Sequence, residues 1–229
     1  KYGLDTWGID PAENIYPISS KNHNIICDFL SQDALDKINR PIDIIYAQNV
    51  FAHQDNPQKF LELCKSVMNP NTLLFIQNSQ SDMIQNNEFD TIYHEHRNFF
   101  SVSSLYTLAS NIGLHLIDVV KGTIHGGSNI FVFSTDAECP ARIKSYMDWE
   151  RIQGLYNYET YKKWADSARQ TVNDLSIVLD AQRKAHNRLI VGYGAPAKGN
   201  TLMNFANEGP DFIVDDNELK QLHFTPGMS

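Results

Sequence analysis

Apolar and polar positions in the first part of the chain form two patterns: short β-prone runs, and one longer stretch in which apolar residues recur at helical spacing. Strand patterns occur at residues 7–10, 42–47 and 72–76. Between the last two, residues 57–68 repeat their apolar side chains at helical spacing, and either Asp55 or Asn56 before them suits a helix cap. A strand–helix–strand order of this kind is typical of a mostly parallel sheet covered by helices. We therefore predict an α/β fold.

Two further β-prone runs, residues 114–120 and 129–133, are separated by a short connection that contains glycines. Such a connection suits an antiparallel hairpin rather than a crossover. A helix is expected before the hairpin, beginning at Ser103 or Ser104 and ending at Gly113. The pattern predicts a sheet that is parallel at one side and antiparallel at the other.

The remainder of the chain contains two further parts, a helical segment and a second α/β unit. Residues 136–187 carry helix-forming composition and predict two helices that form a connecting segment. Residues 188–229 then predict a second, small α/β unit, with strands at 189–191 and 212–214 and a helix from Ala197. The expected organisation is thus a sheet domain over residues 1–135, the helical connection, and the C-terminal unit.

Composition narrows the class of protein. A chain of 229 residues with 42% hydrophobic content can bury a large core, and its net charge of -8 without a Lys/Arg run argues against nucleic-acid binding. No apolar run approaches the roughly 18 residues that predict a membrane span. Cys27, Cys64 and Cys139 lie far apart, which predicts neither a disulfide framework nor a zinc site and favours a reduced, cytoplasmic setting. Because the sequence opens at Lys1 rather than Met, we expect a portion of a longer protein.

Polar residues follow the first two predicted strands, where ligands of open α/β sheets bind. Asp10 could accept hydrogen bonds from a ribose, or it could cap the next helix. Asn49 and His53 follow the second strand. His53 could orient or protonate a substrate, or be a histidine hydrogen-bonded in a loop.

A denser polar run, residues 88–96, follows the third predicted strand. Tyr93, His94, Glu95 and His96 have no simple packing purpose, and this composition indicates acid–base chemistry. If the run is helical, Tyr93 and His96 share one face. The alternatives are a metal site, which the spacing of the two histidines disfavours, and a solvated polar loop.

A glycine-rich turn, residues 192–199, lies between a predicted strand and helix of the C-terminal unit. Backbone N–H groups at a helix start attract phosphate, and Lys198 adds a positive charge. The spacing is neither the dinucleotide fingerprint nor a Walker loop. The turn could hold a pyrophosphate, or its glycines could serve only the tight bend.

Taken in order, these motifs resemble the family of S-adenosylmethionine-dependent deoxysugar C-methyltransferases, which act on TDP-4-keto sugars. The likeness spans nearly the whole chain, and its most specific parts are the Tyr-His-Glu-His run and the 192–199 loop. It implies an incomplete class I methyltransferase (Rossmann-like) sheet plus a small C-terminal nucleotide-sugar-binding unit. The family's N-terminal zinc-binding domain and first cofactor-binding strand have no counterpart here, which again leads us to expect a fragment.

The resemblance also implies roles. His96 matches the family's general base, and Tyr93, Glu95 and His53 match residues of the same pocket. The cofactor, S-adenosylmethionine, would be held by Asp10 at its ribose, by Asn49 at its methionine part, and by Asp28 and Phe29 near its adenine. The nucleotide sugar would be bound by Gly192, Tyr193, Gly194, Ala195, Lys198 and His125.

Other functions fit parts of the pattern. A non-catalytic nucleotide-sugar-binding remnant would not need the run from Tyr93 to His96. An O- or N-methyltransferase needs no base that removes a carbon-bound proton, so solvent deuterium entering a substrate carbon would exclude it. A nicotinamide-linked epimerase or reductase has only Asp215 as a candidate ribose acid.

Overall fold

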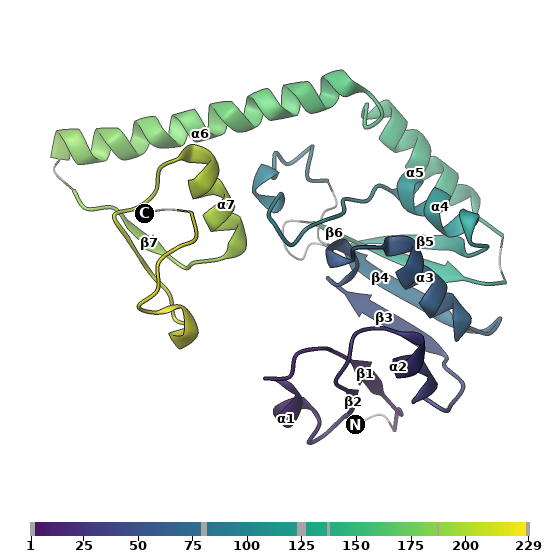
Figure 1. The fold of residues 1–229 in the computed structure, drawn as a ribbon. Coiled ribbons are helices and arrows are strands. Elements are labelled where there is room, and N and C mark those ends of the chain that lie inside the picture. The colour runs from purple at the N-terminus through teal and green to yellow at the C-terminus, as the bar shows by residue number, and fades with distance from the viewer. Residues whose placement is uncertain (1–2, 79–81, 123–126, 137, 187, 228–229) are drawn as a thin grey trace.

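The computed structural model describes residues 3–78, 82–122, 127–136, 138–186 and 188–227. The chain is a mixed α/β protein whose sheet layer leads through two helices to a smaller C-terminal unit (Figure 1). The elements of the first part are β1 (Trp7–Ile9), α1 (Tyr16–Ser19), β2 (Asn24–Ile26), α2 (Gln32–Asp36), β3 (Ile44–Gln48), η1 (Phe51–His53), α3 (Pro57–Ser66), β4 (Leu73–Asn78), η2 (Phe89–Thr91), α4 (Val102–Asn111), β5 (His115–Gly122) and β6 (Ser128–Ser134), where η denotes a 3-10 helix.

The main sheet has four strands in the order β3-β4-β6-β5. Strands β3 and β4 are parallel, whereas β6 is antiparallel to both β4 and β5. The predicted hairpin and the predicted change from parallel to antiparallel pairing are therefore confirmed. Because β3 and β4 are parallel, their carboxyl ends meet at one edge of the sheet, where polar residues follow both strands.

Strands β1 and β2 form a separate parallel pair. The sequence predicted β1 but not β2, which has only three residues and begins with Asn24. Among the described residues β3 pairs only with β4, so its outer edge is unpaired. Ile44 and Tyr46, which share one face of this strand, are 63% and 53% exposed. An apolar strand edge of this kind is a surface that natural proteins usually cover.

The core lies on the face of the main sheet that α3 and α4 cover. Alternate residues of the paired strands supply it: Leu74 and Ile76 from β4 lie opposite Phe133 and Phe131 of β6, and all four are almost completely buried. Burying one such side chain contributes about 1.5–3 kcal/mol. Phe51 of η1 belongs to the same cluster, which fixes the chain that follows β3 against the sheet.

Helix starts depend on single capping side chains. Asn56 caps α3, as predicted, and its side chain accepts a hydrogen bond from the Lys59 N–H. The predicted start of α4 at Ser103 or Ser104 is wrong, because Ser101 is the cap and Ser104 completes a reciprocal capping box with it. The predicted end is confirmed, since Gly113 follows the helix with a φ of 68°.

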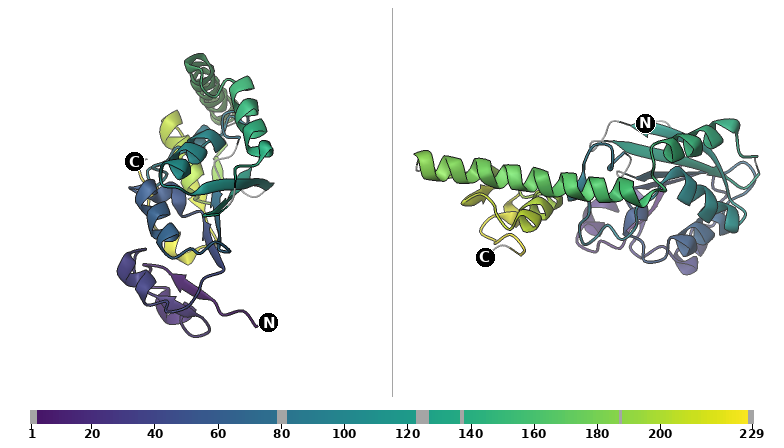
Figure 2. Two further views of the ribbon diagram at one scale, coloured as in Figure 1. Left: turned by 90° about the vertical axis from the view of Figure 1, so that its right-hand side faces the viewer. Right: turned by 90° about the horizontal axis from the view of Figure 1, so that it is seen from above.

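Two helices, α5 (Ala141–Ile152) and α6 (Tyr158–His186), fill the predicted helical segment. The right-hand view of Figure 2 shows α6 running from the sheet layer out to the C-terminal unit. That unit contains β7 (Val191–Tyr193), α7 (Ala197–Ala206), β8 (Phe212–Val214) and η4 (Glu218–Lys220), with β7 and β8 parallel. No helix among the described residues is both long enough and apolar enough to cross a membrane.

The first strand of the C-terminal unit lies two residues later than predicted. Its register is set by β8, which pairs Val191 with Phe212 and Tyr193 with Val214. Gly192 is therefore a strand residue, and a Cβ there would lie 3.0 Å from Pro210. The glycine-rich turn begins only at Gly194.

Candidate active site

Backbone hydrogen bonds join the two polar segments at the carboxyl edge of the main sheet. The N–H groups of Arg97 and Asn98 both donate to the carbonyl of Ala52, at 3.0 and 3.1 Å. This link brings the residues after η2 against η1. As a result the rings of His53 and His96 lie with their centroids 4.9 Å apart.

His96 is buried and both of its ring nitrogens are hydrogen-bonded. Nδ1 lies 2.9 Å from the carbonyl oxygen of Thr91, and Nε2 lies 2.8 Å from the Tyr93 hydroxyl. Because a carbonyl oxygen can only accept, Nδ1 carries the proton of the neutral ring and Nε2 keeps its lone pair. Tyr93 then donates to that lone pair.

Burial lowers the pKa of His96 below its ordinary value of 6.5, although the Thr91 carbonyl opposes the shift. His53 and Lys198 lower this pKa further by their charges. A buried histidine held neutral, with its lone pair directed by a hydroxyl, is suited to accept a proton near neutral pH.

The segment that carries these groups is not an α-helix. Residues 89–91 form the 3-10 helix η2, and a turn follows in which the His96 N–H donates to the Tyr93 carbonyl. The helical spacing considered for Tyr93 and His96 is therefore wrong, but the turn brings the same two side chains together. Their ring centroids are 4.0 Å apart.

His53 and Glu95 contact each other through a backbone group. The His53 Nδ1 lies 2.8 Å from the Glu95 carbonyl oxygen, so Nδ1 is the donor. The Glu95 side chain is exposed, as is His94. Burial raises the pKa of Tyr93, and the charge of Glu95 raises it further, so the phenol stays protonated.

The C-terminal unit packs directly against this segment. The Lys198 ammonium lies 3.8 Å from a carboxylate oxygen of Glu88, and the rings of Phe205 and Phe89 have centroids 5.5 Å apart. Lys198 is also close enough to His96 to affect its pKa. Nothing in the sequence pattern indicates that Lys198 faces the His96 segment, since the contact joins distant parts of the chain.

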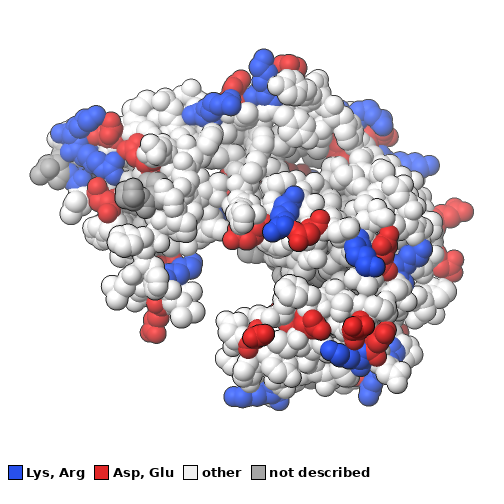
Figure 3. All heavy atoms as spheres, in the orientation of Figure 1, with Lys and Arg blue, Asp and Glu red and all other residues white. Residues whose placement is uncertain are grey.

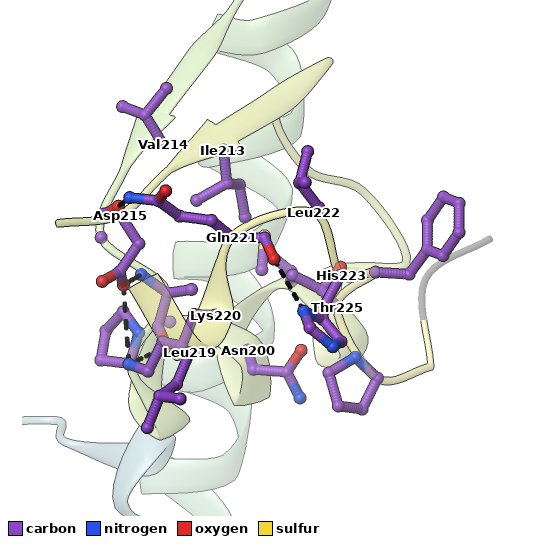
Figure 4. A pocket seen from close by; sticks show the side chains of 17 residues that line it. Asn200, Ile213, Val214, Asp215, Leu219, Lys220, Gln221, Leu222, His223 and Thr225 are labelled. Carbon is purple, nitrogen blue, oxygen red and sulfur yellow. Dashed lines mark hydrogen bonds and ion pairs between the residues drawn. The ribbon is translucent and has the colours of Figure 1, made fainter. Parts of the chain in front are cut away.

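A cavity of about 560 Å³ lies in the C-terminal unit, between α7 and the final segment (Figure 4). Gly194 and Ala195 line it, but the Ala195 N–H already donates to the Asp215 carboxylate at 2.7 Å. This bond, with a second from the Asn217 N–H, lowers the pKa of Asp215. The side chain of Lys220 also lies here, 2.9 Å from the Ala195 carbonyl oxygen.

The residues expected to bind the nucleotide sugar are thus divided in space. Gly194 and Ala195 line the C-terminal cavity, whereas Lys198 faces Glu88. Tyr193 is a strand residue whose hydroxyl donates to Asp216 at 2.5 Å. His125 lies outside the described residues.

Residues expected near the cofactor lie at the carboxyl ends of β1, β2 and β3. Asp10 is not a helix cap: its carboxylate accepts the Ala12 N–H at 2.8 Å in a turn, and α1 begins only at Tyr16. Asn49 has a φ of 51°, and its buried Oδ1 has no partner among the described residues. An unpaired acceptor of this kind suits an amino group of a ligand.

The remaining two cofactor candidates follow β2. The Asp28 carboxylate accepts the Phe29 N–H at 2.8 Å and lies 3.8 Å from the Lys37 ammonium. Phe29 is 73% exposed, which leaves its ring face available for stacking on a heterocycle. A wide hollow separates this part of the molecule from the C-terminal unit (Figure 3). Among the described residues no three His, Cys, Asp or Glu side chains are grouped to hold a metal.

Comparison with known proteins defines the class. Residues 1–119 match the methyltransferase domain family, and residues 123–229 match the C-methyltransferase C-terminal domain family. The chain belongs to the methyltransferase domain family, whose methyl donor is S-adenosylmethionine. This match, together with the strand order of the main sheet, confirms the expected class I methyltransferase fold.

A particular relative agrees with the resemblance found in the sequence. The C-methyltransferase NovU of Streptomyces niveus is 30% identical over 237 residues, which cover 96% of this chain and 55% of that protein. The chain therefore spans about half the length of the curated relative that it matches.

Solved methyltransferase structures are more distant. The plantazolicin methyltransferase BpumL, in complex with a triazolic substrate analogue and S-adenosylhomocysteine, is 13% identical with a TM-score of 0.45, covering 58% of this chain and 68% of that one. A putative sarcosine dimethylglycine methyltransferase from Galdieria sulphuraria is 15% identical with a TM-score of 0.41, covering 59% and 71% of the two chains.

Proposed function

We propose that this protein transfers a methyl group from S-adenosylmethionine to a ring carbon next to the ketone of a nucleotide-diphosphate keto-sugar, with His96 as the general base. The observation that carries the proposal is the buried, neutral His96, whose Nε2 lone pair is held by Tyr93 at the ligand-binding edge of the sheet. The similarity to a C-methyltransferase supports carbon as the acceptor.

Carbon methylation needs a base because a carbon next to a ketone becomes nucleophilic only after losing a proton. In the proposed reaction the Nε2 of His96 takes that proton, and the electron pair of the C–H bond moves toward the ketone oxygen as an enolate. The Thr91 carbonyl, 2.9 Å from Nδ1, stabilises the cationic ring that results. S-adenosylmethionine, when bound, supplies the methyl group, which passes to the deprotonated carbon as its bond to sulfur breaks.

Two proton routes fit the hydrogen bond between Tyr93 and His96. In one route, the substrate displaces the Tyr93 phenol from His96, and the proton on the substrate carbon passes directly to Nε2. In the other, Tyr93 gives its proton to Nε2 and takes the substrate proton itself. Replacing Tyr93 with Phe distinguishes them, since only the second route loses proton abstraction.

The nucleotide sugar is proposed as substrate because two parts of the chain offer binding groups. Lys198 lies beside Glu88 near the His96 segment and can place a positive charge next to a diphosphate. The cavity bordered by Gly194 and Ala195 lies farther along the same unit. A non-catalytic binding remnant would have no use for the His96–Tyr93 pair.

Solvent deuterium exchange tests the proposal. The protein, saturated with S-adenosylhomocysteine in heavy water, should exchange the proton next to the ketone of a TDP-4-keto sugar. His96→Ala should slow this exchange about 10²–10⁴-fold, the usual contribution of a general base. His94→Ala removes an exposed histidine of the same segment and should exchange normally. Undiminished exchange in His96→Ala would contradict the assignment of the base.

A further inference from the structure

Three neighbouring strands of the main sheet carry an asparagine at the same edge: Asn78 ends β4, Asn129 is the second residue of the antiparallel strand β6, and Asn49 directly follows β3. Asn78 is the last residue of β4, and Asn129 lies directly opposite it on β6. Asn49 follows β3 and donates its backbone N–H to the carbonyl of Gln77 at 3.0 Å. We call Asn49, Asn78 and Asn129 the amide row.

The row interrupts an otherwise apolar face. Side chains alternate along strands, so Asn78 continues the face of Leu74 and Ile76, and Asn129 continues that of Phe131 and Phe133. These apolar residues are the centre of the core. Both strands therefore change from apolar to amide at the last paired position, at the edge where ligands bind.

The amide row has hydrogen-bonding groups that the described residues do not satisfy. Asn78 is 3% exposed and neither atom of its amide has a partner, while Asn49 and Asn129 each have a buried Oδ1 without one. Burying an unpaired amide costs about 1–3 kcal/mol in proteins. Such a group in a folded protein needs an explanation, and one explanation is that a ligand completes it.

Two contacts place the row next to His96. Strand β4 packs against η1, which carries His53, and the His53 ring lies against that of His96. Asn129 also lines a cavity of about 670 Å³ that Ile92 and Phe99 border. The Phe99 ring meets the His96 ring edge-on, with centroids 6.2 Å apart.

The proposed reaction requires a donor for the enolate oxygen, and in this structure the two polar side chains whose rings contact His96 donate to groups of the protein. The Tyr93 hydroxyl donates to His96, and the Nδ1 of His53 donates to the Glu95 carbonyl. Asn78 has a buried Nδ2 donor without a partner among the described residues, and it lies at the end of the strand that packs against η1.

We propose that Asn78 donates its amide N–H to the ketone oxygen of the substrate and stabilises the enolate that forms when His96 removes the proton. This inference rests on the proposed function. An amide is suited to the role because it is neutral and cannot itself give up the proton at pH 7. Because no described residue accepts a hydrogen bond from it, this N–H needs no rearrangement to meet the developing charge, and preorganised donors of this kind are the effective ones.

The other members of the row have different positions and roles. Asn49 follows β3, the strand nearer to the β1–β2 pair, and keeps its proposed role in binding the cofactor. Asn129 lies beside Asn78, and the Oδ1 of Asn129 can accept a hydrogen bond from a hydroxyl of the same sugar. A purely structural role for Asn78 would require partners that hold its side chain, and none occurs among the described residues.

Asn78→Leu tests the proposal, because leucine keeps the volume and removes the polar atoms. The turnover number for methyl transfer and the rate of deuterium exchange should both fall about 10²–10³-fold, as when an oxyanion donor is removed. KM for the keto-sugar and the affinity for S-adenosylhomocysteine should be unchanged. The melting temperature should not fall, because the variant no longer buries an unpaired amide. Asn71→Leu, at the exposed turn before β4, is the matched control and should behave as wild type.

Other results would overturn it. If Asn78→Leu has a normal turnover number and the wild-type protein exchanges the proton next to the ketone, the role of Asn78 is refuted and the proposed function stands. A loss of S-adenosylhomocysteine affinity equal to the loss of rate would assign Asn78 to the cofactor instead. A lowered melting temperature with unchanged rate per folded molecule would make it a structural residue. Absence of exchange in the wild-type protein itself would refute the proposed function and this inference together.

Discussion

At the scale of single residues, the protonation of His96 is the property that the proposed chemistry depends on. Its pKa is lowered mainly by burial, so folding favours the neutral ring. The folded state then binds fewer protons than the unfolded state as the pH falls below the ordinary value of 6.5. This contribution to stability is therefore present above 6.5 and is lost as the pH falls.

The same shift predicts a pH profile. The rate of proton abstraction should fall in acid, where the ring becomes charged, with a midpoint below the ordinary histidine value of 6.5. Lys198→Met removes a positive charge that disfavours the charged ring, so the acid limb should move to higher pH. The rate of deuterium exchange measures both profiles, and Lys162→Met, an exposed lysine of α6, is the control. An acid limb that stays in place in Lys198→Met would contradict the contact.

The sequence could predict part of this site and not the rest. Tyr93 and His96 stand close in the chain, so a local turn brings them together. Lys198 reaches the same segment only through tertiary packing, which spacing does not encode. Asn78 and Asn129 were missed because each lies next to the apolar run of its strand, and only the strand register shows that they face each other.

At the scale of elements, a buried carboxylate connects two helices. Glu150 of α5 is 4% exposed and accepts hydrogen bonds from the backbone N–H groups of Val102 and Ser103, at 2.5 and 3.1 Å. These are the first N–H groups of α4, where a negative charge is favoured by the helix dipole. The Tyr156 hydroxyl also donates to it, at 2.9 Å.

Glu150→Ala should therefore lower the free energy of unfolding by about 1.5–3 kcal/mol, the usual contribution of hydrogen bonds to a charged group. Chemical denaturation measures the change. Glu159→Ala, an exposed residue in the first turn of α6, should change it by less than about 0.5 kcal/mol. Equal stability of the two variants would show that Glu150 does not stabilise the start of α4.

Element prediction succeeded where patterns were long and failed where they were short. The helical stripe of α3 and the alternation in β6 were clear in the sequence. Strand β2 was missed because three residues carry no periodicity, and β7 was misplaced because its partner β8 sets its register. The start of α4 was misjudged because several serines in a row could each act as the cap.

At the scale of the whole molecule, the parts of the chain meet around one region. The carboxyl ends of β1 to β4 carry the residues proposed to bind the cofactor and to act as acid or base, and α6 leads to the C-terminal unit, which packs against the segment that contains His96 (Figure 1). Lys198 of that unit lies beside Glu88 of this segment. The proposed function uses this arrangement, because it places the proposed base and the proposed diphosphate-binding group in one region.

Cofactor binding tests this arrangement. If Asp10 accepts the ribose hydroxyls, Asp10→Ala should weaken binding of S-adenosylhomocysteine roughly 10- to 100-fold, because a hydrogen bond to a carboxylate contributes about 1.5–3 kcal/mol. Isothermal titration calorimetry measures the affinity. Glu13→Ala removes an exposed acid from the same loop and should bind normally. Equal affinities for the two variants would remove Asp10 from the cofactor site.

The central claim is methylation of carbon, and the fate of a labelled methyl group tests it most directly. The protein would be given S-adenosylmethionine carrying a ¹³C-methyl group together with a TDP-4-keto sugar, and the product would be examined by NMR. We expect a methyl group bonded to the ring carbon next to the ketone, and no such product from His96→Ala. A labelled methyl group on oxygen or nitrogen, or one formed equally well by His96→Ala, would contradict it.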